Sequence, residues 1–323
     1  MSDANKWKSK LLSSSVPMEY EVARMLVEHE FSVDADYSYS RDDAGVEKDF
    51  SVDIRATGYP PYDADNMVGE VQLIVECKHR HRGNKWLFFP DANPPDMSPF
   101  TPGDTLRAID SFSWRFLPGA CTAAFDEASI FCMKGVEVDA SNGSVHESEI
   151  KHGLMQLQYA LPRLLKDYIN FNIYLSEEEN YPFFFCPILL TTSTLLVANQ
   201  KVSIKAVEDA NVLEDFSSPV PWVVVHSDLT PDFERHRKRE CASLASLVED
   251  ISVKKIDEAR LRGGEYEFLI PSRLCAALSG GVEQRLFKYF SQIVICSLEH
   301  FPTLLTMIKE ITNSAAELKK NRK

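Results

Sequence analysis

Several common sequence signatures are missing from this chain of 323 residues. Its seven cysteines are odd in number and scattered, without CxxC or Cys/His spacing, so neither a disulfide framework nor a zinc site is indicated. The eight histidines form no HxH or HExxH pattern, and no GxGxxG or GxxxxGK[ST] run occurs, which argues against a zinc hydrolase and a nucleotide motor. With 13 glycines, 17 prolines and no fixed repeat, the composition also excludes fibrous, solenoid and propeller proteins.

An excess of basic residues is also missing, because 35 Lys and Arg stand against 48 Asp and Glu, for a net charge of −13. This argues against coating nucleic acid by bulk charge, but it leaves room for a local basic groove or a carboxylate metal site. The first 17 residues hold no apolar core of signal-peptide length, and unpaired thiols fit a reducing compartment, so we expect a cytoplasmic protein. Residues 181–200 are uncharged, but their prolines and Thr/Ser run favour buried strands over a membrane span.

The chain reads as a globular α/β protein of one or two domains, with 44% hydrophobic and 26% charged residues. Periodicity over residues 1–200 predicts helix 17–30, strands 31–41, 50–57 and 70–78, a proline-rich excursion 90–118, helix 147–169 with a kink near Pro162, and strands within 183–198. Beyond residue 200 it predicts strand 222–226, a helix from Asp232, strand 266–270, helical sequence over 282–311 and a frayed basic end at 318–323. We therefore expect a core over 1–200 and an accessory α+β region of unknown role over 201–323.

The second and third predicted strands, residues 50–57 and 70–78, carry the charged residues that indicate a functional site. An antiparallel hairpin between them can place Asp53 opposite Glu76 and Arg55 opposite Ile74. In this register the two faces of the hairpin differ in kind. One face then gathers apolar residues and forms a core, namely Phe50, Val52, Ile54, Ala56, Leu73, Val75 and Cys77. The other face brings Asp53 and Glu76 together, with Lys78 two residues further on. Two opposed carboxylates repel each other, so this pair predicts a cation between them.

This arrangement suits phosphodiester hydrolysis. Asp53 and Glu76, with the Val75 or Cys77 carbonyl, offer hard oxygen ligands to Mg²⁺, which keeps waters for substrate and nucleophile. Lys78 would lie close enough to activate a water or to neutralise charge that grows on the phosphorane. Glu-x-Lys occurs three times in the chain, but only Glu76-Cys77-Lys78 lies in an apolar strand. Two exposed strand acids and a solvated lysine are the alternative interpretation.

The order helix, three-stranded meander, helix, strand, with Asp53 on the second strand and Glu76-Cys77-Lys78 on the third, resembles the PD-(D/E)XK nuclease superfamily. The proline of that motif is absent, since Ser51 and Val52 precede Asp53. The superfamily often adds an acidic residue from the first helix, and similarity to the Mrr-like branch selects Glu19 over Glu21. The resemblance covers about residues 17–200. It implies a restriction-endonuclease-like core with catalytic Asp53, Glu76, Lys78 and Glu19, a metal site of Asp53, Glu76 and Glu19, and Mg²⁺, or Mn²⁺, as cofactor.

Basic residues provide candidate nucleic-acid contacts in two places. The segment after Lys78 and a predicted helix after residue 232 are both rich in Arg and Lys, and each also fits a merely solvated surface. The candidate contacts are Arg80, Arg82, Lys85, Arg235, Arg237 and Lys238. Gln156 resembles a helical glutamine that some superfamily members place beside the metal, although the adjacent Gln158 favours an ordinary surface residue. Asp49 is a further candidate, as an outer group of the metal site.

The sequence therefore predicts a metal-dependent endonuclease. DNA is favoured over RNA because most of the resembling families cut DNA, which makes genome defence or DNA processing the expected role. A homodimer through the C-terminal helices would supply two cuts. The rival is a catalytically inactive protein that keeps the fold and binds nucleic acid or acts as a scaffold.

Overall fold

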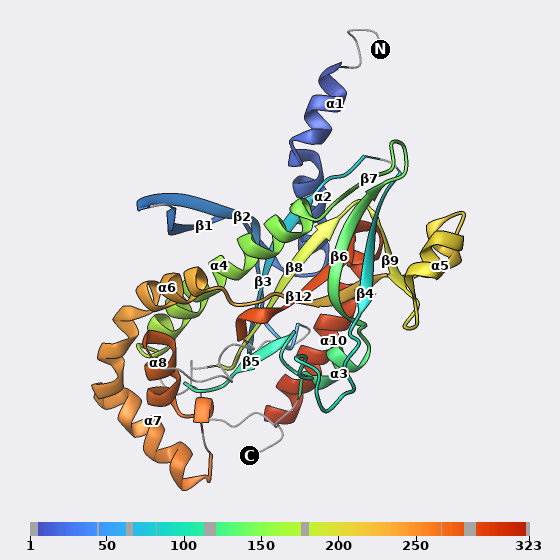
Figure 1. Ribbon diagram of the computed structural model, residues 1–323. Coiled ribbons are helices and arrows are strands. Elements are labelled where there is room, and N and C mark those ends of the chain that lie inside the picture. Colours follow the sequence, from blue (N-terminus) through green and yellow to red (C-terminus); the bar gives the residue numbers. More distant parts are fainter. Residues whose placement is uncertain are drawn as a thin grey trace.

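The computed structural model (Figure 1) has the α/β architecture expected from the sequence. It describes residues 6–43, 45–62, 67–81, 83–112, 121–175, 181–265, 267–280 and 289–320. Within these residues, the strands join in one mixed sheet with the order β1-β2-β3-β8-β12-β11-β6-β4-β9-β10, while β5 pairs with β8 and β7 with β6. The strands are β1 Ser32–Asp43, β2 Val46–Gly58, β3 Glu70–Lys78, β4 Asn84–Pro90, β5 Arg107–Ile109, β6 Phe131–Asp139, β7 Ser144–His146, β8 Phe183–Thr191, β9 Thr194–Ala198, β10 Ser217–Pro219, β11 Trp222–His226 and β12 Gln292–Ser297.

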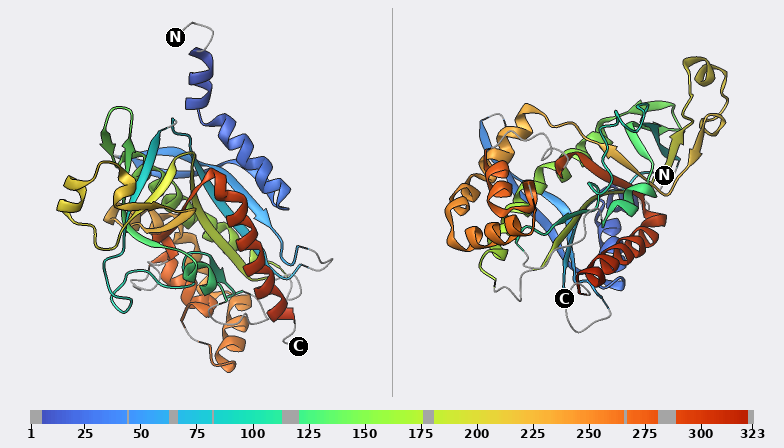
Figure 2. Two further views of the ribbon diagram at one scale, coloured as in Figure 1. Left: turned by 90° about the vertical axis from the view of Figure 1, so that its right-hand side faces the viewer. Right: turned by 90° about the horizontal axis from the view of Figure 1, so that it is seen from below.

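Helices cover both faces of this sheet (Figures 1 and 2). The α-helices are α1 Lys6–Ser13, α2 Val16–Glu28, α3 Ala123–Glu127, α4 Ser148–Asn172, α5 Ile204–Asp209, α6 Pro231–Glu240, α7 Ile251–Arg262, α8 Pro271–Ser279 and α10 Phe301–Lys320. Short 3-10 helices span Leu213–Asp215, Ala242–Glu249, Glu267–Leu269 and Leu298–His300. One core lies under α4, α6 and α8, and a second lies under α2, α3 and α10.

Helices α2 and α4 form where the periodicity predicts them. Pro17 lies in the first turn of α2, where a missing N–H is tolerated, and Met18, Val22 and Leu26 are buried along one face. Helix α4 contains Pro162 and buries a continuous apolar stripe against β1, β2, β3 and β8. The two helices therefore clamp the strand pair β2–β3 from opposite sides.

Strands β1, β2 and β3 form an antiparallel meander, and β8 adds to β3 in parallel. The predicted register of β2 and β3 is confirmed, because Arg55 pairs with Ile74 and Ile54 with Val75. Apolar residues at alternate positions fix this register, since a slip by one residue would turn the whole set toward the opposite face.

The prediction that one face holds all the apolar residues of this hairpin is wrong. Ile54, Ala56, Leu73, Val75 and Cys77 belong to the core under α2 and α10, whereas Val52, with Phe50 packed beside it, belongs to the core under α4. The reversal occurs next to Asp36 of β1, which has a positive φ of 57° and lies between the pairs Ala35–Ile54 and Tyr37–Val52. The change of face therefore coincides with this left-handed residue, while the register of β1 and β2 is the same on both sides of it.

Other sequence expectations also need correction. Four strands, β4 to β7, lie between β3 and α4, and β5 falls inside the expected proline-rich excursion. The strand expected over 266–270 is wrong, because Glu267–Leu269 is a 3-10 helix and Pro271 starts α8; residue 266 is not described. In the expected helical segment 282–311, Gln292–Ser297 forms β12 and α10 starts at Phe301, while 281–288 is not described. The buried run of Ile293, Val294 and Ile295 has no periodicity that separates a strand from a helix.

Strands from both sides of residue 200 share the sheet. Strand β12 pairs in parallel with β8 and antiparallel with β11, which in turn pairs with β6. The region after residue 200 thus completes the centre of the sheet, while α6, α7 and α8 extend the layer beside α4. Chain segments on the two sides of this position therefore depend on each other for burial.

The suspected membrane segment is strand, as expected, because β8 and β9 occupy most of residues 181–200 and are largely buried. Among the described helices, none combines the length and apolar character that crossing a bilayer requires. All seven cysteines lie in described positions and are free thiols.

Candidate active site

Two charged side chains leave β3 on the face that packs against α4. Because side chains alternate along a strand, Glu76 and Lys78 share this face with the core residue Ile74. Glu76 is 1% exposed, and the side chain of Lys78 is 15% exposed. Lys78 Nζ donates a hydrogen bond of 2.7 Å to Glu76 Oε1. The strand therefore holds an almost fully buried ion pair.

Asp53 lies on β2, one residue beyond the last pair of the β2–β3 ladder, Ile54 with Val75. Its Oδ2 accepts a hydrogen bond of 2.7 Å from the backbone N–H of Cys77. The carboxylate thus bonds to the backbone of the residue between Glu76 and Lys78. This contact brings Asp53 to the ion pair of β3.

Burial and the charge of Asp53 both act on the Glu76 carboxyl. Burial, and next the charge of Asp53, raise the pKa of Glu76 to about 7, although Lys78 opposes the shift. The pKa of Asp53 is also raised, chiefly by burial, while the Cys77 N–H and Lys78 act to lower it. Glu76 Oε2 is buried without a hydrogen-bond partner. With two carboxylates against one ammonium, the cluster carries surplus negative charge where water is scarce, and a cation would relieve it.

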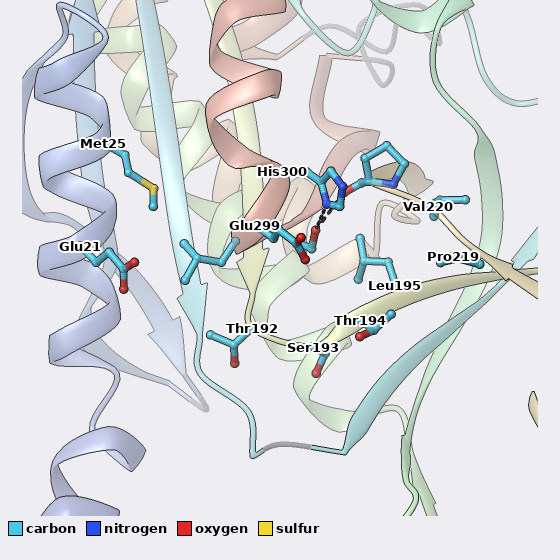
Figure 3. Close-up of a pocket in the computed structure, with 13 residues that line it drawn as sticks. Glu21, Met25, Thr192, Ser193, Thr194, Leu195, Pro219, Val220, Glu299 and His300 are labelled. Atoms are coloured by element: carbon cyan, nitrogen blue, oxygen red, sulfur yellow. Dashed lines mark hydrogen bonds between the residues drawn. The ribbon is translucent and has the colours of Figure 1, made fainter.

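Glu19 approaches the same cluster from the first turn of α2. Burial raises its pKa, and the charges of Asp53 and Asp36 add to the rise while Lys78 opposes it. Glu21 instead lines a separate cavity of about 640 Å³, with Met25 beside it on α2 (Figure 3). Glu299 and His300 lie across this cavity, where His300 Nδ1 and Ser297 Oγ are 2.8 Å apart. Glu19 therefore interacts electrostatically with Asp53 and Lys78, while Glu21 lies at the separate cavity.

Gln156 of α4 is not an ordinary surface glutamine, so that interpretation of the sequence is wrong. Its Oε1 accepts a hydrogen bond of 3.0 Å from Lys78 Nζ, and its Nε2 donates to the carbonyl of Ser51 at 3.3 Å. Gln158 is buried and donates to the carbonyls of Phe290 and Ser227. Both glutamines thus fix α4 against its neighbours, and Gln156 also holds the ammonium of Lys78.

The donor groups fit a divalent cation of the hard class. Over the described residues, no group of three or more His, Cys, Asp or Glu side chains is arranged to hold a metal ion. Mg²⁺ often binds through only one or two carboxylates and keeps several waters, so Asp53 and Glu76 are sufficient for it. The buried Glu76 Oε2 without a partner is the kind of atom that such an ion would satisfy. Asp49 bonds to Ser40 Oγ on the exposed part of the hairpin, and no contact places it at this site.

The basic residues that follow β3 have structural partners. Arg80 pairs with the buried Glu137 at 2.6 Å and with Glu149 at 3.4 Å. Glu137 also accepts hydrogen bonds from Asn84 and from the ring N–H of Trp86. Lys85 pairs with Glu214 and is partly exposed, while Arg82 lies outside the described residues. Arg80 thus mainly connects strand ends, although a quarter of its side chain stays exposed.

On α6, only part of the expected basic surface is available. Arg237 is 1% exposed and donates to the carbonyls of Ala277 and Leu278 near the end of α8, so its assignment to nucleic-acid binding is wrong. Its side chain satisfies helix-end carbonyls that would otherwise be buried without donors. Arg235, with 72% of its side chain exposed, and Lys238 face outward.

Comparison with known proteins adds no relative, because no family model, no curated protein and no solved structure matches this chain. Function is therefore inferred from the residues of the site.

Proposed function

We propose that this protein is a Mg²⁺-dependent endonuclease that hydrolyses phosphodiester bonds, with DNA favoured over RNA as substrate and Mn²⁺ able to replace Mg²⁺. The observation that carries the proposal is the cluster of Asp53, Glu76 and Lys78, in which two coupled carboxylates meet one ammonium and one buried carboxylate oxygen lacks a partner. A phosphodiester is the substrate that uses all of these groups, because its negative charge requires both a cation and a nearby donor.

The arrangement of elements supports the resemblance to PD-(D/E)XK nucleases. Helix α2, the meander β1–β3, helix α4 and the parallel strand β8 follow one another in the order that the resemblance implies, with β4 to β7 inserted. Asp53 lies on the second strand, and Glu76 and Lys78 lie on the third. The preference for DNA comes from the resemblance, since most of the families involved cut DNA.

Each residue of the cluster has a distinct role in this proposal. Asp53 and Glu76 would hold the ion. The three-acid metal site expected from the sequence is not formed among the described residues, so Glu19 would add negative charge from α2 without being a third ligand. When bound, Mg²⁺ polarises a phosphoryl oxygen and lowers the pKa of a water. The ammonium of Lys78 would donate to the negative charge that grows on the phosphoryl group. Gln156 would keep this ammonium in place, because it bonds to Lys78 and to the backbone of β2.

Plasmid cleavage by the full chain tests the proposal, with Mg²⁺, Mn²⁺ or EDTA in parallel reactions. Lys78→Ala should lower the cleavage rate about 100- to 1000-fold, the range for loss of one preorganised electrostatic donor. DNA affinity should change little, because it is summed over many phosphate contacts. Asp53→Asn should remove metal affinity together with activity.

Lys151→Ala is the matched control, because Glu149-Ile150-Lys151 repeats the Glu-x-Lys pattern on α4 with an exposed lysine. It should cleave at the wild-type rate. If the wild-type protein binds nucleic acid but cuts neither DNA nor RNA with either metal, the alternative of an inactive nuclease-fold binding or scaffold protein replaces the proposal.

A further inference from the structure

A second cavity, of about 410 Å³, lies between the tip of the β1–β2 hairpin and α6. Figure 1 shows these two elements on the same side of the molecule. Its lining contains three arginines and two aspartates, and consists of Arg41, Asp42, Gly45, Asp232, Arg235, His236 and Arg239. We refer to Arg41, Arg235, His236 and Arg239 as the arginine pocket.

Arg41 is held in place by aromatic rings. Its guanidinium lies 4.8 Å from the centre of the Phe50 ring and 4.5 Å from that of Tyr159, so two aromatic rings fix its plane. Its Nε is buried and has no hydrogen-bond partner, and its positive charge interacts with the Asp232 carboxylate. A guanidinium stacked on rings keeps its N–H edge available, which is the geometry that binds oxyanions.

The acidic residues of the cavity already have partners. Asp42 accepts a hydrogen bond of 2.8 Å from the backbone N–H of Gly45. Asp232 accepts from the hydroxyl of Tyr159 at 2.8 Å and from Arg235 at 3.0 Å. The nearest carboxylate to Arg239 is that of Glu47, at the long distance of 3.9 Å. The lining holds three arginines against two aspartates, so it keeps a net positive charge that favours an anionic ligand.

The arginine pocket lies next to the candidate active site on two elements. On α4, Tyr159 follows Gln156 by three residues, so the two side chains lie on one side of the helix about one turn apart. On β2, Phe50 precedes Asp53 by three residues, which corresponds to about 10 Å along the strand.

We propose that the arginine pocket binds a backbone phosphate of the nucleic acid that the active site cleaves, to one side of the scissile bond. This inference rests on the proposed function for the identity of the ligand. It extends the contact surface beyond Arg235 to Arg41, His236 and Arg239. Because the contact is to a phosphate, it would position the substrate without reading its sequence.

Binding of a short labelled DNA duplex in EDTA tests this pocket separately from cleavage. Fluorescence anisotropy of the full chain over a salt series should show that Arg41→Gln weakens binding about tenfold and reduces the salt slope by about one. Arg235→Gln, at a largely exposed position, should act in the same direction without affecting folding. Arg41→Lys should bind with intermediate affinity, because it keeps the charge but not the planar stack.

Arg262→Gln is the control, since it removes the same charge from the exposed face of α7. It should bind as the wild type does. If both Arg41→Gln and Arg235→Gln bind DNA with the wild-type affinity and salt slope, the proposal that the arginine pocket binds phosphate is overturned. Plasmid cleavage by the same preparations would show that the proposed function still holds. Arg41-dependent binding without cleavage would support the pocket and overturn the nuclease. Arg41-dependent binding of polyglutamate but not of DNA would overturn the pocket as a phosphate site.

Discussion

Glu76 should destabilise the metal-free protein when it is ionised, and Glu76→Gln measures this effect. The carboxyl is buried beside Asp53, and its second oxygen has no hydrogen-bond partner. Glutamine has nearly the same shape but no charge. It therefore removes the repulsion with Asp53, and it keeps a carbonyl oxygen that can accept from Lys78.

The size and the sign of the effect follow from the pKa. A rise from 4.5 to about 7 on folding corresponds to roughly 3 kcal/mol, at about 1.4 kcal/mol for each tenfold change in proton affinity. Because the folded state holds the proton more tightly, stability from this group is fully present below pH 4.5 and is lost as the pH rises to about 7. At pH above about 7 the full cost applies. The weakened bond to Lys78 offsets part of the gain, so Glu76→Gln should be about 1–2 kcal/mol more stable than wild type there.

Urea unfolding in EDTA at pH 5 and pH 8 measures the difference between variant and wild type. From pH 5 to pH 8, the free energy of unfolding of the variant should rise by roughly 2–3 kcal/mol relative to that of the wild type. Glu137→Gln is the matched control, because Glu137 is equally buried but accepts from Arg80, Asn84 and Trp86. It should lose about 2 kcal/mol at pH 8 by weakening these bonds. An equal loss for Glu76→Gln at both pH values would refute the electrostatic reasoning.

Two further predictions concern metal binding and packing. At a Mn²⁺ concentration of about 100 times the dissociation constant, thermal unfolding should show the wild type stabilised by about 2–3 kcal/mol. The same Mn²⁺ concentration should stabilise Asp53→Asn much less. Equal stabilisation of both proteins would place the ion elsewhere. Gly153→Ala should destabilise the fold by about 1–2 kcal/mol, because a Cβ there would lie 2.5 Å from Cδ1 of the buried Leu189. The contact would push α4 away from the sheet together with Gln156, so the cleavage rate should also fall. Urea unfolding and plasmid cleavage check this variant, and wild-type stability would contradict the close packing of α4 on β8.

Local signals in the sequence determined the strand pair and the first helix. The apolar alternation around Asp53 and Glu76 specifies the register of β2 and β3, because only one register buries Ile54 against Val75. Pro17 and the spacing of Met18, Val22 and Leu26 specify where α2 starts and which face it buries. These features depend on residues near one another in the chain, so a period of 2 or 3.6 is enough to read them.

Contacts between distant segments decided the rest of the site. Gln156 bonds to Lys78 across 78 positions of sequence, and no local pattern distinguishes it from a solvated glutamine. Arg237 looks like a surface charge in its helix, but α8 packs over it and supplies the carbonyls that it binds. Arg41 of β1 stacks on Phe50 of β2 and on Tyr159 of α4, a contact between segments that are distant in the sequence. The periodicity of the sequence predicts which face of its own helix or strand a side chain occupies. The residue that it contacts across that face is determined only when the sheet and both helix layers assemble.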